Sequence, residues 1–546
     1  MLFMSSESFV NISRPLTEMA ALQPDTAAII FPEQHRTLTF RELDDWSSRL
    51  AAGFERLGIS RGVRTALLVP PSPELFAVTF ALFKCGAVPV LIDPGIGARN
   101  MKGCLADASP AAFIGIPKAH LARRLLGWGR ASLRTLITVN GGRFWGGIPL
   151  AEVQGSETAY TPAETRRDET AAILFTSGST GSPKGVVYTH GNFAAQIAAL
   201  QEMYGISPGE IDLPTFPLFA LFAPALGMTA LIPQMDFTRP GMVDPQKIIE
   251  IAREYRATPM FGSPALLNRV GRYGAAHGVS LPHMKRVISA GAPVPAAVLE
   301  RFAGLLPADA GIFTPYGATE ALPVSSIGHR EILAETSRAT CKGKGICVGL
   351  PVTGLAVAII PITDEPVPGW SDDLRLPAGE IGEIAVSGPQ VTAAYFGRPE
   401  ATRLAKIAAP DGGFWHRMGD LGYRDEAGRI WFCGRKSHRL ITRQGVLFTI
   451  PVEGVFNAHP DVFRTALVGS GERGSQRPVL CVELEKGVGR REETRIRREL
   501  LEIGARFQHT AGVREILFHP AFPVDIRHNA KIFREKLALW ATGRLA

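Results

Sequence analysis

Residues 172–188, Ala-Ile-Leu-Phe-Thr-Ser-Gly-Ser-Thr-Gly-Ser-Pro-Lys-Gly-Val-Val-Tyr, join a short apolar run to a loop of small, hydroxylated and glycine residues. The apolar run 172–175 is typical of a buried strand. The loop combines hydroxyls, one lysine and glycines that let the backbone approach closely, which together suit a polyphosphate. Its spacing is not that of a Walker loop. The candidate nucleotide-binding residues here are Thr176, Ser177, Gly178, Ser179, Thr180, Gly181 and Lys184.

Strand-like and helix-like stretches alternate around this segment. Residues 40–57 place Leu43, Trp46, Leu50 and Phe54 at helical spacing. Such alternation predicts an α/β architecture with crossover helices. At 546 residues the chain exceeds one compact core, so two or more domains are expected. The expected strands include residues 65–69, 87–92, 136–139 and 171–175.

Composition narrows the functional class. Hydrophobic residues make up 46% and charged residues 20% of the chain, as in an ordinary globular protein. The net charge is +8, but no basic stripe is interleaved with aromatic residues, so nucleic acid is not expected as a partner. The six cysteines show no C-x-x-C spacing and the N-terminus lacks a signal-peptide pattern. We therefore expect a cytoplasmic protein with reduced thiols.

Residues 213–235 contain no charged side chain, which is long enough to suggest a membrane span. Pro214, Pro217, Pro224 and Pro233 argue against a transmembrane helix, because each interrupts helical hydrogen bonding. The run is either ordinary core or the lining of an apolar pocket. The sequence leaves these two readings open.

Six further sequence motifs occur along the chain in the order in which one protein family has them. Together with the phosphate loop they resemble the motifs of the adenylate-forming superfamily, which holds acyl-CoA synthetases, peptide-synthetase adenylation domains and luciferases. The resemblance spans nearly the whole chain. Its elements are residues 84–94, Ser289-Ala290-Gly291-Ala292-Pro293, Tyr316-Gly317-Ala318-Thr319-Glu320, Gly419-Asp420, Gly434-Arg435-Lys436 and Asn529-Ala530-Lys531-Ile532.

This resemblance implies a fold and a first reaction. The fold would have a large N-terminal adenylating domain of mixed α/β subdomains, residues 1–435, and a small mobile α+β C-terminal domain, residues 436–546. ATP would activate a carboxylate as an acyl-AMP, with Mg²⁺ as the accompanying ion. Two anions must meet in that step, so the site has to neutralise charge on both.

Roles for individual residues follow from the same resemblance. Lys531, Glu320 and Thr319 would be catalytic: Lys531 would bridge the carboxylate and the α-phosphate, Thr319 would bind that phosphate, and Glu320 would hold the magnesium ion. The other implied contacts to the nucleotide are Tyr316, Gly317 and Ala318 with Gly291, Ala292 and Pro293 around the adenine, Asp420 on the ribose, and Arg435 on the ribose and phosphate side.

Departures from the common pattern point to one branch. Ser437 stands where many acyl-CoA synthetases carry Asp or Lys, and residues 215–222 lack a histidine that many relatives have. These departures, with residues 212–217, 261–266, 314–320 and 525–531, resemble the olefin β-lactone synthetases. In that branch a long-chain 2-alkyl-3-hydroxy acid is adenylated and its own β-hydroxyl displaces AMP. The alternatives are a long-chain acyl-CoA or acyl-carrier ligase, and a non-catalytic protein that binds nucleotide or acyl chain.

The substrate side of the site is less defined by the sequence. Phe216, Phe219 and Phe222 are candidates for an acyl pocket, as is His190, for which an ordinary satisfied histidine is the alternative. By resemblance, the protein could assemble with a condensing enzyme, a reductase and a β-lactone decarboxylase of an olefin pathway.

Overall fold

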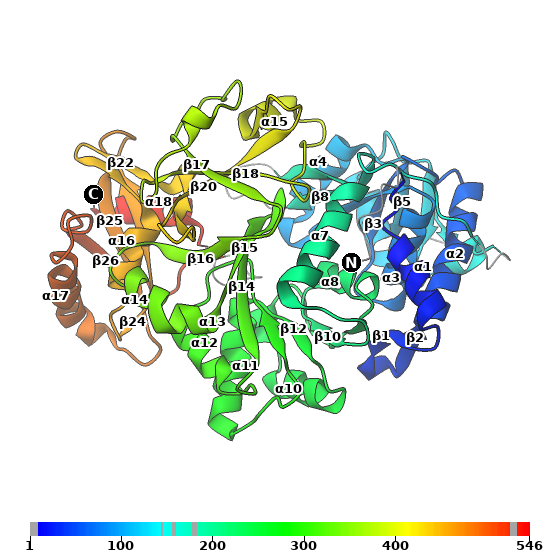
Figure 1. Ribbon diagram of the computed structural model, residues 1–546, viewed down its shortest axis with the longest axis horizontal. Coiled ribbons are helices and arrows are strands. Elements are labelled where there is room, and N and C mark those ends of the chain that lie inside the picture. Colours follow the sequence, from blue (N-terminus) through cyan, green and yellow to red (C-terminus); the bar gives the residue numbers. More distant parts are fainter. Residues whose placement is uncertain (1–8, 144–145, 156–159, 177–182, 525–531, 546) are drawn as a thin grey trace.

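Two large β-sheets covered by helices make up most of the molecule (Figure 1). The computed structural model describes residues 9–143, 146–155, 160–176, 183–524 and 532–545. The first sheet has the order β7-β6-β5-β3-β4-β8-β9 and is parallel except for the β8–β9 hairpin. Its strands are β3 (Arg64–Leu68), β4 (Val88–Ile92), β5 (Ala112–Gly115), β6 (Thr135–Thr138), β7 (Ile148–Pro149), β8 (Thr170–Thr176) and β9 (Lys184–Thr189).

Helices pack on this sheet as the periodicity predicts. The helix expected over residues 40–57 is α2 (Phe40–Arg56), and the four expected strands lie within one residue of β3, β4, β6 and β8. A capping box starts α2, because Thr39 Oγ1 accepts from the Glu42 amide at 3.1 Å and Glu42 Oε2 from the Thr39 amide at 2.8 Å. The neighbouring helices are α1 (Arg14–Leu22), α3 (Pro73–Lys84), α4 (Ala98–Ala108), α5 (Pro117–Leu126) and α6 (Leu150–Val153).

The second sheet runs through the middle of the molecule, in the order β17-β18-β20-β21-β16-β15-β14-β13-β12-β10-β11-β1-β2, with β19 beside β20. Strands β10 to β14 and the β11–β1 pair are parallel, and the rest are antiparallel. The strands are β1 (Ala27–Phe31), β2 (Arg36–Thr39), β10 (Ile211–Pro214), β11 (Thr229–Leu231), β12 (Pro259–Phe261), β13 (Arg286–Ile288), β14 (Gly311–Ala318), β15 (Ala321–Gly328), β16 (Ile346–Pro351), β17 (Ala356–Ile360), β18 (Gly382–Ser387), β19 (Lys406–Ala408), β20 (Phe414–Arg424) and β21 (Ile430–Arg435).

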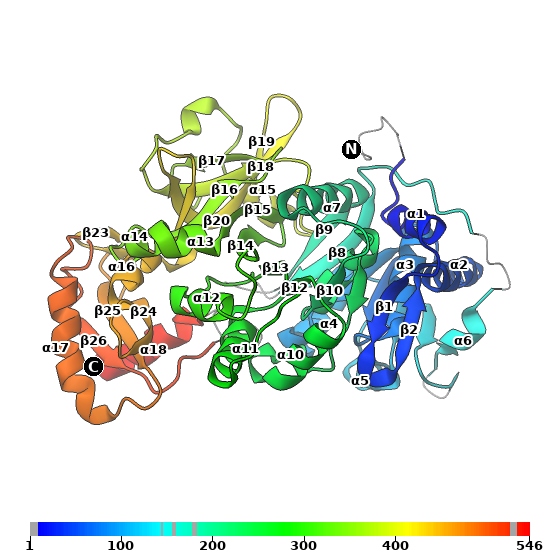
Figure 2. The same cartoon turned by 60° about the horizontal axis from the view of Figure 1, so that its bottom comes forward.

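Helices also cover the second sheet, and α7 lies between the two sheets (Figure 2). A capping box of Thr189 and Asn192 starts α7. The helices of this region are α7 (His190–Tyr204), α8 (Pro217–Ala220), α9 (Phe222–Ala225), α10 (Pro245–Glu254), α11 (Pro264–His277), α12 (Ala296–Ala303), α13 (His329–Glu331), α14 (Ser337–Thr340) and α15 (Pro399–Ala405).

The uncharged run 213–235 is divided among several short elements. It contains the end of β10, both α8 and α9, and β11. Pro217 starts α8 and Pro224 lies inside the four-residue α9, so the prolines keep these helices short. Leu213, Leu226 and Met228 are buried in the cores. In the described ranges, no helix has both the length and the apolar character needed to cross a bilayer.

The last hundred residues form a smaller α+β domain with its own core, as the resemblance predicts. A three-stranded sheet of β24, β25 and β26 packs against α16, α17 and α18 (Figure 1). The predicted boundary at 435/436 falls between β21 and the 3-10 turn Lys436–His438, and its exact place stays a prediction. The elements are β22 (Leu440–Thr442), β23 (Gly445–Leu447), β24 (Val462–Ser470), β25 (Arg477–Leu484), β26 (Glu515–Phe518), α16 (Thr449–Phe456), α17 (Glu493–Gly504) and α18 (Arg534–Leu545).

A buried acidic side chain lies beside an ion pair in the second sheet. Arg286 Nη2 donates to Glu210 Oε1 at 3.1 Å, and both side chains are buried next to Asp212 on β10. Burial, together with the charge of Glu210, raises the pKa of Asp212 to about 7, although Arg286 opposes the rise. In the unfolded chain the same carboxyl titrates near 3.8.

This difference makes stability depend on pH. Between about pH 4 and 7 the folded state binds more protons than the unfolded state, so the free energy of unfolding falls as the pH rises through this window. Asp212→Asn removes the titration. We expect the variant to match the parent near pH 4 and to be more stable at pH 8, by on the order of 4 kcal/mol. Urea denaturation at both pH values checks this, and an unchanged pH dependence in the variant contradicts it.

Candidate active site

The candidate site lies where parallel strands of the second sheet end. Strands β12, β13 and β14 run in the same direction, so their carboxyl ends meet at one edge. The predicted adenine-side loop, containing Gly291, Ala292 and Pro293, follows β13 directly and is tied to β14 by the Ser289 amide, which donates to Phe313 O at 2.9 Å. Gly291 has φ +92°, which favours glycine.

Thr319 and Glu320 form the turn of the β14–β15 hairpin, between the paired residues Ala318 and Ala321. A side chain at Gly317 would lie 2.7 Å from Ala321 O, so the turn needs glycine there. The Tyr188 hydroxyl donates to Thr319 O, which joins this turn to β9.

One segment holds Glu320 at both its backbone and its carboxylate. The Thr392 amide and hydroxyl donate to Glu320 O at 2.9 and 3.1 Å. The Tyr395 hydroxyl donates to Glu320 Oε1 at 2.6 Å. The same segment pairs with β9, because the Val187 amide donates to Ala394 O at 3.1 Å. The segment 392–395 therefore holds Glu320 close to the β8–β9 hairpin, whose strands flank the predicted phosphate loop. We call Thr392 and Tyr395, with their contacts to Glu320, the Glu320 bracket.

Two lysines surround this bracket. Lys406 Nζ donates to Thr392 O, and Lys184 Nζ lies 4.9 Å from the centre of the Tyr395 ring. Burial lowers the pKa of Lys406 to about 7, and the charge of Glu320 opposes this shift. His416, paired with Lys406 across β19 and β20, is buried, and burial followed by the charge of Lys406 holds its pKa well below the usual range. The surroundings of Glu320 are therefore rich in basic groups.

Tyr316, Asp420 and Arg435 come together from three strands. The Tyr316 hydroxyl donates to Asp420 Oδ2 at 2.7 Å, and Arg435 Nε lies 3.1 Å from Asp420 Oδ1. Burial raises the pKa of Asp420, while Arg435 and Tyr316 oppose the shift. Asp420 Oδ1 is buried and, apart from its ion pair with Arg435, accepts no hydrogen bond from the described residues. Such an acceptor fits a ligand hydroxyl, as a ribose would supply.

Several predicted residues lie outside the described ranges. These are Ser177, Gly178, Ser179, Thr180, Gly181 and Lys531. The strands on either side of the phosphate loop are described: Thr176 ends β8 and pairs with Lys184, the first residue of β9. Lys184 is exposed. The ends of β8 and β9 that flank the predicted loop are thus paired with each other.

His190 is a buried structural histidine in this fold. It is the first residue of α7, and its Nδ1 accepts from the backbone amide of Ile12 at 3.2 Å. Burial lowers its pKa to about 4. Of the two interpretations left open by the sequence, this geometry favours the satisfied histidine.

The three candidate phenylalanines divide into two clusters. Phe216 and Phe219 have ring centres 5.1 Å apart, and Phe219 meets Phe261 edge to face at 4.5 Å. Phe222 packs instead on Phe193, which stacks on Tyr188 at 4.8 Å. All three candidates are half-buried. The Phe216 cluster flanks the end of β12, while Phe222 joins the core around α7.

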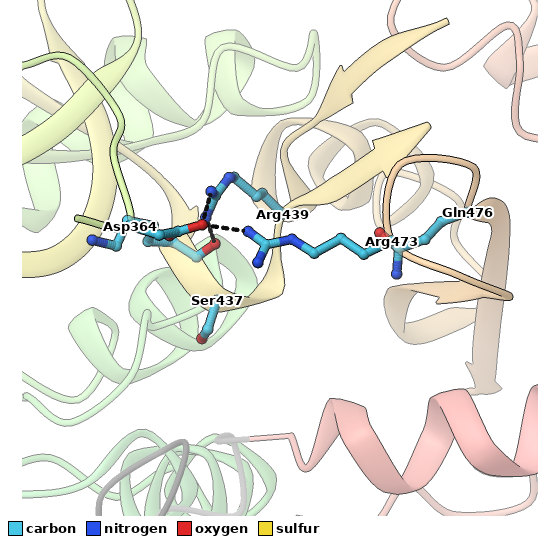
Figure 3. A pocket seen from close by; sticks show the side chains of 6 residues that line it. Asp364, Ser437, Arg439, Arg473 and Gln476 are labelled. Carbon is cyan, nitrogen blue, oxygen red and sulfur yellow. Dashed lines mark hydrogen bonds and ion pairs between the residues drawn. The ribbon is translucent and has the colours of Figure 1, made fainter. Parts of the chain in front are cut away.

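A separate cavity of about 260 Å³ lies at the junction of the two domains (Figure 3). Asp364 Oδ2 accepts from Arg439 Nη2 at 2.9 Å and from Arg473 Nη2 at 2.8 Å. Lys436 Nζ reaches into the large domain and donates to Glu383 Oε2 at 3.0 Å. Glu383 is fully buried and also pairs with Arg417 at 2.7 Å. The chain is thus tied to the large domain on both sides of Ser437.

Sequence reasoning missed Thr392, Tyr395, Lys406 and His416. Their contacts to the Glu320 region are long-range, and a lone lysine is usually a surface residue. The signal that could have found Tyr395 is its place in a short extended stretch just before a proline-started helix, α15. No local pattern marks Lys406.

Comparison with known proteins agrees with this geometry. A family model described as "AMP-binding enzyme" matches residues 16–396. An olefin β-lactone synthetase of Xanthomonas campestris is 51% identical, covering 97% of each chain, and one of Stenotrophomonas maltophilia is 50% identical, covering 98% of each. The solved structure of an amide bond synthetase from Marinactinospora thermotolerans superposes with a TM-score of 0.79 at 22% identity, over 97% of this chain and 99% of that one.

The chain belongs to the AMP-binding, adenylate-forming enzyme family. The two olefin β-lactone synthetases are 50–51% identical to the chain, whereas a feruloyl-CoA synthase of Amycolatopsis is 28% identical, covering 79% of this chain and 80% of that one.

Proposed function

We propose that the protein is an ATP-dependent β-lactone synthetase, an AMP-forming ligase acting on a long-chain 2-alkyl-3-hydroxy acid. The observation that carries this proposal is the identity of 50–51% to two olefin β-lactone synthetases over nearly the full length of the chain. The acyl-CoA ligase and the non-catalytic binding protein are less favoured. The described site retains Glu320, Asp420, Arg435 and Lys184.

The reaction has two steps. A carboxylate oxygen of the acid attacks the α-phosphorus of ATP, and pyrophosphate leaves. The β-hydroxyl oxygen of the same molecule then attacks the acyl carbon, the acyl–phosphate bond breaks, and AMP leaves with the β-lactone formed. Because the nucleophile is tethered, its effective concentration reaches on the order of 10⁵ M or more.

Residues of this chain bind and orient the nucleotide. Asp420 accepts from the ribose hydroxyls through Oδ1, which accepts no hydrogen bond within the described residues, and Tyr316 and Arg435 hold the carboxylate in place. The adenine lies along Gly291, Ala292, Pro293, Gly317 and Ala318. Lys184 and the loop from Thr176 bind phosphate oxygens, Thr319 binds the α-phosphate, and Lys531 bridges the two reacting anions.

The hydroxyl proton passes to a phosphate oxygen of the departing AMP. His190 is a poor acceptor, because its Nδ1 already accepts from Ile12 and its lowered pKa makes it a weak base. The Phe216 and Phe219 cluster contributes to the apolar side of the acyl site.

Glu320 would hold Mg²⁺ when ATP binds. No cluster of three or more His, Cys, Asp or Glu side chains able to hold a metal occurs in the described part of the chain. Glu320 fits an ion that takes one protein carboxylate and the remaining oxygens from phosphates and water. When bound, the ion neutralises charge on the phosphates. Tyr395 donates to the carboxylate that would bind the ion, and Thr392 holds the backbone carbonyl of the same residue.

The experiment that tests the reaction needs no thiol. The enzyme is incubated with ATP, Mg²⁺ and a synthetic long-chain 2-alkyl-3-hydroxy acid, without CoA, and the extract is examined by NMR. We expect a β-lactone together with stoichiometric AMP. Acyl-AMP that accumulates until CoA is added would contradict the proposal and favour an acyl-CoA ligase. ATP binding without pyrophosphate release would favour the non-catalytic protein.

A second prediction concerns Tyr395. Tyr395→Phe removes the hydroxyl that donates to Glu320 and leaves the ring, so we expect the KM for MgATP to rise roughly tenfold, the worth of one hydrogen bond to a charged group. Pyrophosphate-release kinetics at varied MgATP check this. Tyr204→Phe is the matched control, because this buried hydroxyl interacts with Ser326 at 3.2 Å instead. Equal KM values for the two variants would contradict a positioning role for Tyr395.

The cellular setting extends the proposal. The proposed substrate and product suit a cytoplasmic olefin pathway. In that pathway a condensing enzyme and a reductase would supply the 2-alkyl-3-hydroxy acid, and a β-lactone decarboxylase would consume the β-lactone.

A further inference from the structure

The surface of α5 combines exposed leucines with unpaired cations. Leu121, Leu125 and Leu126 are exposed by 41%, 74% and 43%. Leu121 and Leu125 are four residues apart and Lys118 precedes Leu121 by three, so these side chains share one face of the helix. Among the large hydrophobic residues that are exposed in the described ranges, no other three lie within six positions. This is a patch, in contrast to the scattered leucines of most surfaces.

Basic residues surround that face without acidic ones. Residues 108–151 contain Lys118, Arg123, Arg124, Arg130, Arg134 and Arg143 and no Asp or Glu. Arg143 pairs with Glu152, and Arg123 lies against the Phe113 ring. Lys118, Arg124, Arg130 and Arg134 are exposed, and no ion pair of theirs is found within the described ranges. We define the α5 surface as Lys118, Leu121, Arg124, Leu125, Leu126 and Arg130.

The place of α5 in the fold leaves this surface open. The helix connects β5 to β6 near one edge of the seven-stranded sheet. Its inner side is buried at His120, whose Nε2 lies 2.9 Å from Ile137 O. In Figure 2, α5 is labelled at the lower edge of the molecule, away from β14 and the candidate active site. The outward face of α5 can therefore contact a partner without changing the candidate active site.

We propose that the α5 surface docks the protein on an anionic lipid bilayer. An apolar helix face flanked by cations inserts its leucines at the headgroup level while its cations contact anionic headgroups. A second copy of this chain is a poor occupant, because two α5 surfaces would bring like charges together. The benefit of docking rests on the proposed function: a long-chain acid and its lactone partition into bilayers, so docking brings the enzyme to its substrate.

Vesicle sedimentation tests the proposal with the full-length enzyme. The probes are sucrose-loaded vesicles of phosphatidylcholine alone and of phosphatidylcholine with phosphatidylglycerol. We expect binding to the anionic vesicles, little binding to the neutral ones, and loss of binding at high salt. Each cation near an anionic surface is worth about a five-fold gain in affinity. Lys118→Gln/Arg124→Gln/Arg130→Gln should therefore weaken binding by about a hundredfold.

Leu121→Ser/Leu125→Ser tests the apolar part and should weaken binding at least about tenfold. The matched controls are Lys486→Gln/Arg490→Gln/Arg491→Gln, which removes the same charge from exposed residues of the small domain, and Leu539→Ser, which changes a leucine that is 77% exposed on α18. Both controls should bind vesicles as the parent does. Turnover of a short, water-soluble 3-hydroxy acid without vesicles should be unchanged in all four variants, which separates this proposal from the proposed reaction.

Three results would overturn the docking proposal. One is equal binding of the parent to neutral and anionic vesicles. Another is binding by the α5 variants as tight as that of the controls. The third is a change of oligomeric mass in the α5 variants without lipid, which would assign the surface to a protein partner.

Discussion

Glu320→Ala is expected to abolish detectable AMP formation, with a loss of at least about a thousandfold in the rate of pyrophosphate release. Glu320 lies at the turn between β14 and β15, where Tyr395 donates to its carboxylate and Thr392 donates to its backbone carbonyl, and basic side chains surround it. Removing it leaves Lys184 and Lys406 without their anionic neighbour and removes the proposed ligand of Mg²⁺. Coupled pyrophosphate assay and chromatography of AMP measure the loss.

Glu320→Gln is the control for shape. The amide oxygen can still accept from Tyr395, so the turn should fold as in the parent, while the negative charge is lost. We expect this variant to be nearly as inactive as the alanine variant, with unchanged circular dichroism. Turnover retained in Glu320→Ala would rule out its role. The Lys531→Ala variant is expected to show the same loss, and retained AMP release there would rule out the role of that lysine.

Glu383→Ala is expected to give the largest loss of stability. The carboxylate is fully buried and accepts from Arg417 at 2.7 Å and from Lys436 at 3.0 Å. Removing one partner of a buried ion pair leaves uncompensated charge, which costs about 3–5 kcal/mol of unfolding free energy. Urea and thermal denaturation measure this loss.

Glu380→Ala is the matched control, because Glu380 is exposed and has no ion pair in the described ranges. A surface change of that kind is expected to stay within about 0.5 kcal/mol of the parent. Equal stability of the two variants would show that Arg417 and Lys436 find water or other partners when Glu383 is removed.

Much of the fold follows from local sequence. The period of residues 40–57 predicted α2 to within one residue, because its buried face repeats every turn and Thr39 caps its start. The four expected strands, residues 65–69, 87–92, 136–139 and 171–175, were predicted as closely, since they are short apolar runs between turn residues. The division into a large and a small domain came from resemblance, since periodicity alone does not show which strands share a sheet.

Residues of the candidate site could be predicted from the sequence only where they belong to a recognised motif. Tyr316, Asp420 and Arg435 are far apart in the chain, and their meeting is a property of the sheet order β14-β15-β16-β21-β20. Tyr395 and Lys406 could not be found from local pattern, because their meaning depends on a segment folded back on β9. His190 shows the opposite case. It lies beside a motif in the sequence, but its Nδ1 accepts from the backbone amide of Ile12.

The ion pairs on either side of Ser437 predict where along the chain the small domain would rotate, given the mobility that the family resemblance implies. The contacts of Arg439 and Arg473 to Asp364 are partly exposed, and such pairs are worth at most about 1 kcal/mol each. The Lys436 tie to Glu383 is buried and far stronger. If the outer pairs release, we expect Lys436 to stay with the large domain and the rotation to occur at Ser437 and His438. Ser437 is the second residue after the predicted boundary at 435/436, and its small side chain would hinder such a rotation little.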